Sequence, residues 1–359
     1  MVRTDIKPLP GDNTPRASLI YGTTVEGAGL EDSSVHAIIT ELPVPGFGSG
    51  PAFSWPSIKY SPTPSSPSMK VPAEDVTFGE EETVEGYIAH AVHAFRELRR
   101  VLRPDGTAWV HVRDRYVENK QLALIPHQVA LALQADGWIL RNEVIWQRDN
   151  ASPESAKDRL TRTHGTLFLL AHPDSGGAYF YDPDSIREPH KSMDEKHIKG
   201  YNKDTNMADG YSRRPELDKA WHPKGRNRRT VWPVNLGAYL GKSVSPWPQA
   251  LVDTMVRASC SGGGVCSECG AQLVRQTDDS WIFDCDHEGS GVSRPWVLDP
   301  FSGTAVTGKA ALDWGANYIG VDIDIEVLPE GRARLEGLTH SRKVLQQKES
   351  PILEMFGDV

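Results

Sequence analysis

One stretch near the C-terminus limits the folds open to this chain more than any other. Residues 297–324 contain an apolar run ending in Asp299, a turn with Gly303, a helical stretch to Trp314, and a second apolar run ending in Asp322. This order predicts a strand, a turn, a helix and a second strand, as in α/β sheets that bind nucleosides. Acids that end neighbouring parallel strands meet at one sheet edge, so we expect a ligand crevice there.

The rest of the chain supplies further elements of one large α/β core. Apolar residues at helical spacing, and stretches of helical character, predict helices over 87–102, 122–135, 249–259 and 304–314. Short apolar runs predict strands over 35–40, 107–112, 138–146 and 166–170, with a turn at 103–106. A Pro- and Ser-rich stretch over 43–72 is expected to form a mobile flap.

The net charge of −9 over 359 residues does not point to nucleic acid, and the distribution of charge is more informative than its sum. Residues 185–232 hold 12 Lys and Arg against 7 Asp and Glu, with aromatic residues between them. Such a segment pairs with phosphates and stacks on bases, although a solvated linker has the same composition. The candidate DNA-binding residues are Arg213, Arg214, Lys224, Arg226, Arg228 and Arg229.

The four cysteines suggest a metal site. Cys266 and Cys269 form a C-x-x-C pair, and Cys285 precedes His287 by two positions. This spacing resembles a zinc ribbon with a tetrahedral structural site, with Cys260 as a substitute ligand and free thiols as the alternative. The sequence has no apolar run of membrane-spanning length and no signal-peptide core, so we expect a cytoplasmic protein.

A family resemblance rests on two motifs. Asp299-Pro-Phe-Ser-Gly303 and Asn317-Tyr-Ile-Gly-Val-Asp322 resemble the cofactor motif of S-adenosylmethionine (SAM)-dependent DNA amino-methyltransferases, and Phe95–Thr107 is also similar to the family. The order, with the catalytic strand first, is similar to the permuted beta group. The resemblance implies the Rossmann-like, seven-stranded mixed sheet of class I methyltransferases. It also implies transfer of a methyl group to the exocyclic amino nitrogen of cytosine or adenine in double-stranded DNA.

The resemblance also assigns site residues. The family's catalytic tetrapeptide is Asp, Asn or Ser, then Pro-Pro, then an aromatic residue that stacks on the flipped base. Here Glu41-Leu42-Pro43-Val44 stands in its place, so Glu41, Pro43 and Val44 are the candidate catalytic residues. Phe47, Phe53 or Trp55 are candidates to supply the missing ring. The candidate SAM-binding residues are Thr23, Asp299, Phe301, Gly303, Ala305 and Asp322.

Three functions remain open at this point. The chain is a DNA amino-methyltransferase with an atypical catalytic loop, a related DNA-base transferase with a changed donor or chemistry, or an inactive DNA-binding or partner subunit. A homodimer and a hetero-oligomer are both compatible with these functions. The expected organisation is a catalytic half (1–174, with its loop and flap at 40–72), a target-recognition region (175–240), a returning helix (241–259), a zinc-ribbon-like insertion (260–293), a SAM-binding half (294–340) and a tail (341–359).

Overall fold

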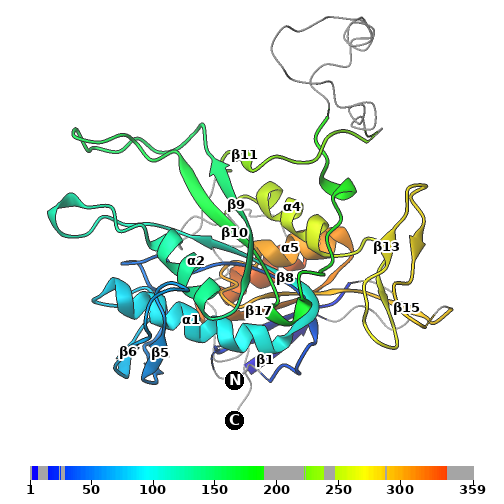
Figure 1. Ribbon diagram of the computed structural model, residues 1–359, viewed down its shortest axis with the longest axis horizontal. Helices are drawn as coiled ribbons and strands as arrows, with labels where there is room; N and C mark the ends of the chain where they lie inside the picture. Colours follow the sequence, from blue (N-terminus) through cyan, green and yellow to red (C-terminus); the bar gives the residue numbers. More distant parts are fainter. Residues whose placement is uncertain are drawn as a thin grey trace, which may run out of the picture.

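The computed structural model describes residues 2–6, 15–23, 25, 29–189, 222, 224–237, 247–287 and 289–337. Its centre is one twisted sheet with helices on both faces (Figure 1). Among the described residues the sheet has nine strands, in the order β1 (Val2–Ile6), β2 (Ala17–Tyr21), β17 (Asn317–Asp322), β16 (Trp296–Asp299), β3 (Val35–Glu41), β8 (Leu102–Val112), β10 (His164–Ala171), β9 (Ile139–Gln147) and β11 (Val231–Pro233).

The strand directions confirm the expected α/β fold. Strands β2, β17, β16, β3 and β8 are parallel, and β10 runs antiparallel between β8 and β9. The seven strands from β2 to β9 form the expected mixed sheet, to which β1 and β11 add one strand at each edge. Strand β3 of the predicted catalytic half pairs in parallel with β16 of the predicted SAM-binding half. Both predicted halves therefore contribute strands to one sheet.

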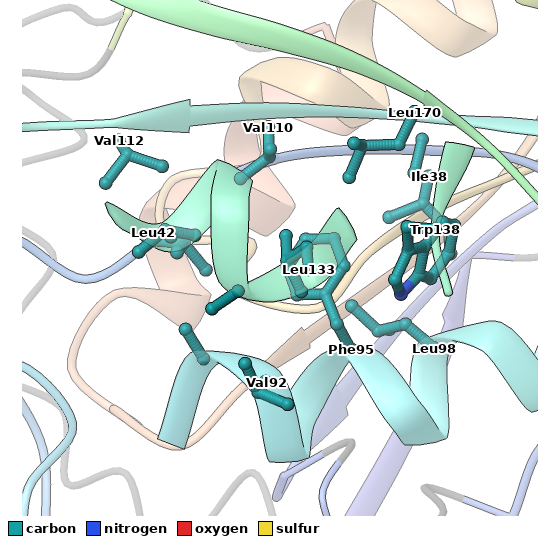
Figure 2. Close-up of a cluster of buried hydrophobic side chains, with 14 of the residues drawn as sticks. Ile38, Leu42, Val92, Phe95, Leu98, Val110, Val112, Leu133, Trp138 and Leu170 are labelled. Carbon is teal, nitrogen blue, oxygen red and sulfur yellow. The ribbon is translucent and has the colours of Figure 1, made fainter. Parts of the chain in front are cut away.

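Helices pack on both sheet faces and form two separate cores. One core holds α1 and α2 against Ile38, Val110 and Leu170, as Figure 2 shows. The other holds α4, α5 and Leu335 of α6 against Ala37, Trp109 and Leu169. The helices are α1 (Val84–Val101), α2 (Ile125–Ala135), α4 (Gln249–Ser259), α5 (Val306–Trp314) and α6 (Leu328–Leu335), with 3₁₀ turns η2 (Glu118–Lys120), η3 (Pro173–Ser175) and η4 (Asp184–Ile186).

The expected turn at 103–106 lies inside β8 as a bulge. Helix α1 ends at Val101, and β8 begins at Leu102. Leu102 stands opposite Val35 and Thr107 opposite Ala37, so residues 103–106 bulge out opposite the single residue His36 of β3. Gly106 is required here, because a Cβ on it would lie 2.8 Å from the carbonyl oxygen of His36. The Pro-Asp-Gly sequence therefore serves an irregular strand.

The expected mobile flap is largely an ordered, packed subdomain. Strand β4 (Phe53–Trp55) pairs with β7 (Glu74–Val76), and β5 (Ile58–Tyr60) pairs with β6 (Met69–Val71). Trp55, Ile58 and Tyr60 are buried in the same core as α1, which anchors the segment. The Pro and Ser residues limit these strands to three residues each rather than preventing them.

The insertion after α4 contains two small sheets. Strand β12 (Val265–Cys266) pairs with β15 (Val292–Ser293), and β13 (Val274–Arg275) pairs with β14 (Trp281–Ile282). The part of the chain that the structure describes contains no helix long and apolar enough to cross a bilayer.

Candidate active site

A cavity of about 620 Å³ opens where the carboxyl ends of β3, β16 and β17 face the segment after β3. Its volume is in the range of ligand pockets. Two polypeptide segments distant in sequence therefore share it, as the resemblance implied. It is lined by most of the predicted catalytic and SAM-binding residues, namely Thr23, Glu41, Pro43, Val44, Asp299, Phe301, Gly303 and Asp322, and also by Phe47 and Trp247.

Asp299 ends β16 at the floor of the cavity and is only 2% exposed. Its Oδ1 accepts hydrogen bonds from the Thr40 hydroxyl (2.7 Å) and the Phe301 amide (3.2 Å). Burial, assisted by the nearby Asp322, outweighs these bonds and raises the pKa of Asp299 to about 7. A positively charged ligand group would therefore bind best to its ionised form.

Asp322 ends the neighbouring strand β17 and anchors the glycine turn. Its Oδ2 accepts from the Gly303 amide (2.6 Å), and its Oδ1 accepts from the Asp324 amide (2.9 Å). Burial raises the pKa of Asp322 to about 6. Gly303 has a φ of +48°, which a residue without Cβ adopts at little cost. The turn and the acid thus fix each other beside the cavity.

Ala305 differs from the other predicted SAM-binding residues, because it does not line the cavity. It is fully buried, has a φ of +56°, and lies just before α5. Its methyl group packs close to Gly331 of α6, and a Cβ on Gly331 would lie 3.3 Å from this methyl carbon. The structure therefore places the extra methyl of this turn between helices rather than against the cavity.

Glu41 ends β3, and two basic side chains hold it. Its Oε1 accepts from Arg113 Nε (2.5 Å) and lies 3.1 Å from His111 Nδ1. Burial alone would raise the pKa of Glu41, but Arg113 and His111 outweigh burial and lower this pKa to about 2. Glu41 is therefore a fixed carboxylate at neutral pH.

The next three residues of the tetrapeptide have different surroundings. Leu42 is completely buried in the core beneath the cavity (Figure 2). The carbonyl of Pro43 accepts a hydrogen bond from the Tyr87 hydroxyl at 2.8 Å. Val44 lines the cavity, and its carbonyl accepts from the Phe47 amide in a tight turn. Packing in the core thus anchors Leu42, which stands where the resemblance leads one to expect a proline.

All three candidate rings line the cavity, and Phe47 is the most exposed of them. Trp55 is buried, with its ring 4.0 Å from that of His90, and Phe53 packs edge-on against Trp55. Phe47 is 69% exposed and lines the cavity, three residues after Val44. The turn that carries it is fixed by hydrogen bonds from Gly46 to Gly79 and from Gly48 to Glu80.

Sequence reasoning missed His111 and Trp247. His111 pairs with Glu41 in the register of β8 and β3, which no motif revealed. Trp247 lines the cavity just before α4, and its ring is nearly parallel to that of His111 at 6.3 Å. A Cβ on Gly165 would lie 2.5 Å from His111 Nε2, so this glycine makes room for the imidazole. The signal for Trp247 was a tryptophan between two prolines at a helix start.

The described basic residues of the 185–232 segment pair with acids or rings. Lys224 pairs with Asp279 and Asp184, while Arg226 and Arg229 both pair with Glu188. The guanidinium of Arg228 lies over the ring of Trp232 at 5.0 Å. Arg213 and Arg214 lie outside the described residues.

The structure brings the predicted metal ligands together. Ligand atoms of Cys266, Cys269, Cys285 and His287 all lie within 4.8 Å of one another. Cys260 is fully buried at the end of α4, where burial raises its thiol pKa, and is not part of this cluster. The donor set of three sulfurs and one imidazole nitrogen fits a tetrahedral zinc site.

Comparisons with known proteins agree with this geometry. A model of a DNA methylase family, N6_N4_Mtase, matches residues 63–331. The type II methyltransferase M.SmaI of Serratia marcescens is 28% identical over 285 residues, which are 72% of this chain and 76% of that protein. M.SfiI of Streptomyces fimbriatus is 35% identical over 234 residues, 60% of this chain and 49% of that protein. The solved PvuII DNA methyltransferase (cytosine-N4-specific) has a TM-score of 0.55 at 12% identity, with coverage of 93% and 91%.

Proposed function

Because this chain belongs to the N6/N4 DNA methylase family of SAM-dependent enzymes that methylate exocyclic amino groups of DNA bases, we propose that the cavity between Glu41, Asp299 and Asp322 is its active site. The observation that supports the proposal most strongly is the convergence of these three acids on one cavity. They come from three adjacent parallel strands, β3, β16 and β17. When bound, SAM supplies the electrophilic methyl group.

Asp299 and Asp322 are the proposed residues that hold SAM. Asp322 is ordered by two backbone amides and offers carboxylate oxygens at the edge of the cavity, which suits hydroxyl groups of a ribose. Asp299 offers negative charge at the cavity floor, which suits a cationic group. Thr23, Phe301 and Gly303 complete this side of the cavity.

Glu41 is the proposed acceptor for the target amino group. A fixed carboxylate that accepts a hydrogen bond from the amino group orients the nitrogen toward the methyl donor. Glu41 has one methylene more than an aspartate, and Arg113 and His111 remove the freedom that this adds by holding Oε1. The carbonyl of Pro43, two residues after Glu41, accepts a hydrogen bond from the Tyr87 hydroxyl, which orients it.

Phe47 is the proposed substitute for the aromatic residue that the tetrapeptide lacks. It is exposed, lies at the cavity, and follows Val44 in a pinned turn. A phenyl ring offers a flat apolar surface on which an extruded base stacks. This assignment compensates for the loss of a ring at Val44.

Two measurements test this function. Calorimetric titration of the purified protein with SAM should show binding, which Asp322→Ala should abolish. Labelled methyl from SAM should be transferred to bacterial genomic DNA in a reaction that Glu41→Ala stops. SAM binding without any transfer to DNA would contradict the proposal and favour an inactive partner subunit.

We also propose that Cys266, Cys269, Cys285 and His287 bind one structural zinc ion. The loop they form contacts the central sheet through Arg103, which donates to the Cys269 carbonyl (2.9 Å), and His36, which bonds the Gly270 carbonyl (3.0 Å). On its other side, Arg275 pairs with Asp182 at 3.0 Å. Zinc at this position would connect the sheet to the start of the proposed recognition region. Metal analysis of the purified protein should give about one zinc per chain.

A further inference from the structure

Two loops beside the active site form a rim that the proposed chemistry does not explain. Loop 113–124 follows β8, and loop 148–163 joins β9 to β10. Strand β9 runs in the same direction as β8, so both loops leave the sheet at the edge where Glu41 lies. Figure 1 shows both loops extending from the same side of the molecule.

Contacts between side chains join the two loops. The guanidinium of Arg159 lies 4.2 Å from the ring centroid of Tyr116, and that of Arg162 lies 5.4 Å from it. Arg162 also donates to the Asp114 carbonyl at 2.7 Å, and Lys120 pairs with Asp158 at 2.5 Å. These contacts hold the loop 148–163 against the neighbouring loop.

The base of the rim is positively charged and adjoins Glu41. The Arg148 amide closes loop 148–163 on the Thr163 carbonyl at 2.7 Å, and its guanidinium lies over Trp146. Arg113 contacts Glu41 directly. Burial, and then repulsion from Arg113 and Arg162, lowers the pKa of Arg148.

The rim also presents apolar side chains to solvent. Leu160 is 91% exposed and, among the described residues, is the most exposed of the large hydrophobic side chains. It stands between Arg159 and Arg162. Tyr116, Leu122 and Leu124 of the neighbouring loop are exposed as well. An isolated exposed leucine is ordinary, whereas one flanked by arginines next to a base-binding cavity suits a nucleic acid.

We propose that loop 148–163 enters duplex DNA beside the active site and that Leu160 inserts into the base stack there. An extruded base leaves an apolar gap between its neighbours, and apolar wedges fill such gaps in other DNA-binding proteins. The arginines on either side of Leu160 suit the phosphates that flank the gap. The proposal rests on the proposed function, because it assumes a DNA substrate, and it adds a contact outside the basic segment 185–232.

The test compares duplex and single-stranded DNA. Fluorescence anisotropy, without SAM, follows binding of a fluorescein-labelled duplex with one abasic site, which leaves the same gap as an extruded base, and of its intact strand alone. Leu160→Ala should weaken duplex binding about tenfold and leave binding of the single strand unchanged, because a single strand has no closed stack to enter. Leu131→Ala, on the exposed side of α2, is the matched control and should change neither affinity.

Salt dependence provides a second readout. Leu160→Ala should leave the slope of log affinity against log salt unchanged, while Arg159→Ala should reduce it by about one. Duplex affinity of Leu160→Ala equal to that of the wild type, or an equal loss on both DNAs, would overturn the proposal. The binding measurements contain no SAM and do not depend on catalysis. If the variants show these effects but the wild-type protein never methylates DNA, only the proposed function is contradicted.

Discussion

Glu41 and His111 face each other in the register of two parallel strands, and Glu41 Oε1 lies 3.1 Å from His111 Nδ1. Together with Arg113 this pairing keeps a partly buried glutamate ionised at the position where the resemblance leads one to expect a shorter polar residue. Glu41→Gln keeps the shape but removes the charge. We expect it to lower kcat for methyl transfer at least tenfold while SAM affinity stays within about twofold. Steady-state kinetics with calorimetry measure both, and unchanged kcat would remove Glu41 from the reaction.

The pH dependence of activity should report on Arg113. With the pKa of Glu41 at about 2, the carboxylate stays ionised from pH 4.5 to 9, and its stabilising effect on the fold is lost progressively as the pH falls from about 4.5 to about 2. In Arg113→Met, burial is less opposed and the pKa of Glu41 rises. The acid limb of the kcat/KM profile should therefore move to higher pH, whereas Arg113→Lys should retain most of the wild-type profile. An acid limb at the same pH in the wild type and in Arg113→Met would contradict this role.

Ionised Asp299 should lower the stability of the fold and at the same time be needed for SAM binding. Its pKa rises from 3.8 to about 7 on folding, so ionisation of this buried group lowers stability progressively between about pH 4 and pH 7. Asp299→Asn removes this loss while an amide oxygen remains to accept from Thr40. We expect the free energy of unfolding of the variant to exceed that of the wild type by roughly 3 kcal/mol at pH 8 and to equal it near pH 4. Urea unfolding at both pH values measures this. SAM binding should be lost in the same variant.

Phe47 should contribute through its ring. Stacking of a base on an aromatic side chain contributes about 1–3 kcal/mol, so Phe47→Ala should lower kcat/KM for DNA by roughly tenfold. Phe47→Trp should retain activity, and Phe47→Leu, which keeps apolar volume without a ring, should behave like the alanine variant. SAM affinity should be unaffected in all three. Equal activity of the leucine variant and the wild type would show that stacking is not the role.

Removal of the proposed zinc ion should destabilise the central sheet as well as the cluster itself. The loop proposed to bind zinc contacts Arg103 and His36 of the central sheet, so chelation should lower the melting temperature by several degrees or more. Cys269→Ser should show the same loss without chelator. Cys260→Ala, outside the cluster, should retain about one zinc per chain. Full zinc content in Cys269→Ser would contradict the assigned ligands.

The sequence predicts those parts of the molecule that depend on neighbours along the chain. Helix α4 occurs over the predicted 249–259, and the strand–turn–helix–strand unit brings Asp299 and Asp322 to one edge. The four metal-ligand candidates also meet. Spacing alone identifies these features, because each is a local pattern or a pair of strand ends.

Features set by tertiary pairing were out of reach. The contact of His111 with Glu41 depends on strand register, and the position of Trp247 depends on how α4 packs. Residues 103–106 form the predicted change of direction, but that it is a bulge within one strand, between the pairs Leu102–Val35 and Thr107–Ala37, depends on pairing with β3. The Pro-rich flap gains its order from burial of Trp55 and Tyr60 against α1, which local composition does not show.

The nucleosides of modified DNA test the central claim most directly. DNA from cells that express the wild-type protein, digested to nucleosides and analysed by mass spectrometry, should contain cytidine or adenosine deoxynucleosides heavier by one methyl group on the exocyclic nitrogen. DNA from cells that express Glu41→Ala should lack them. Unmodified nucleosides with the wild type, or an increment other than one methyl group, would contradict the account.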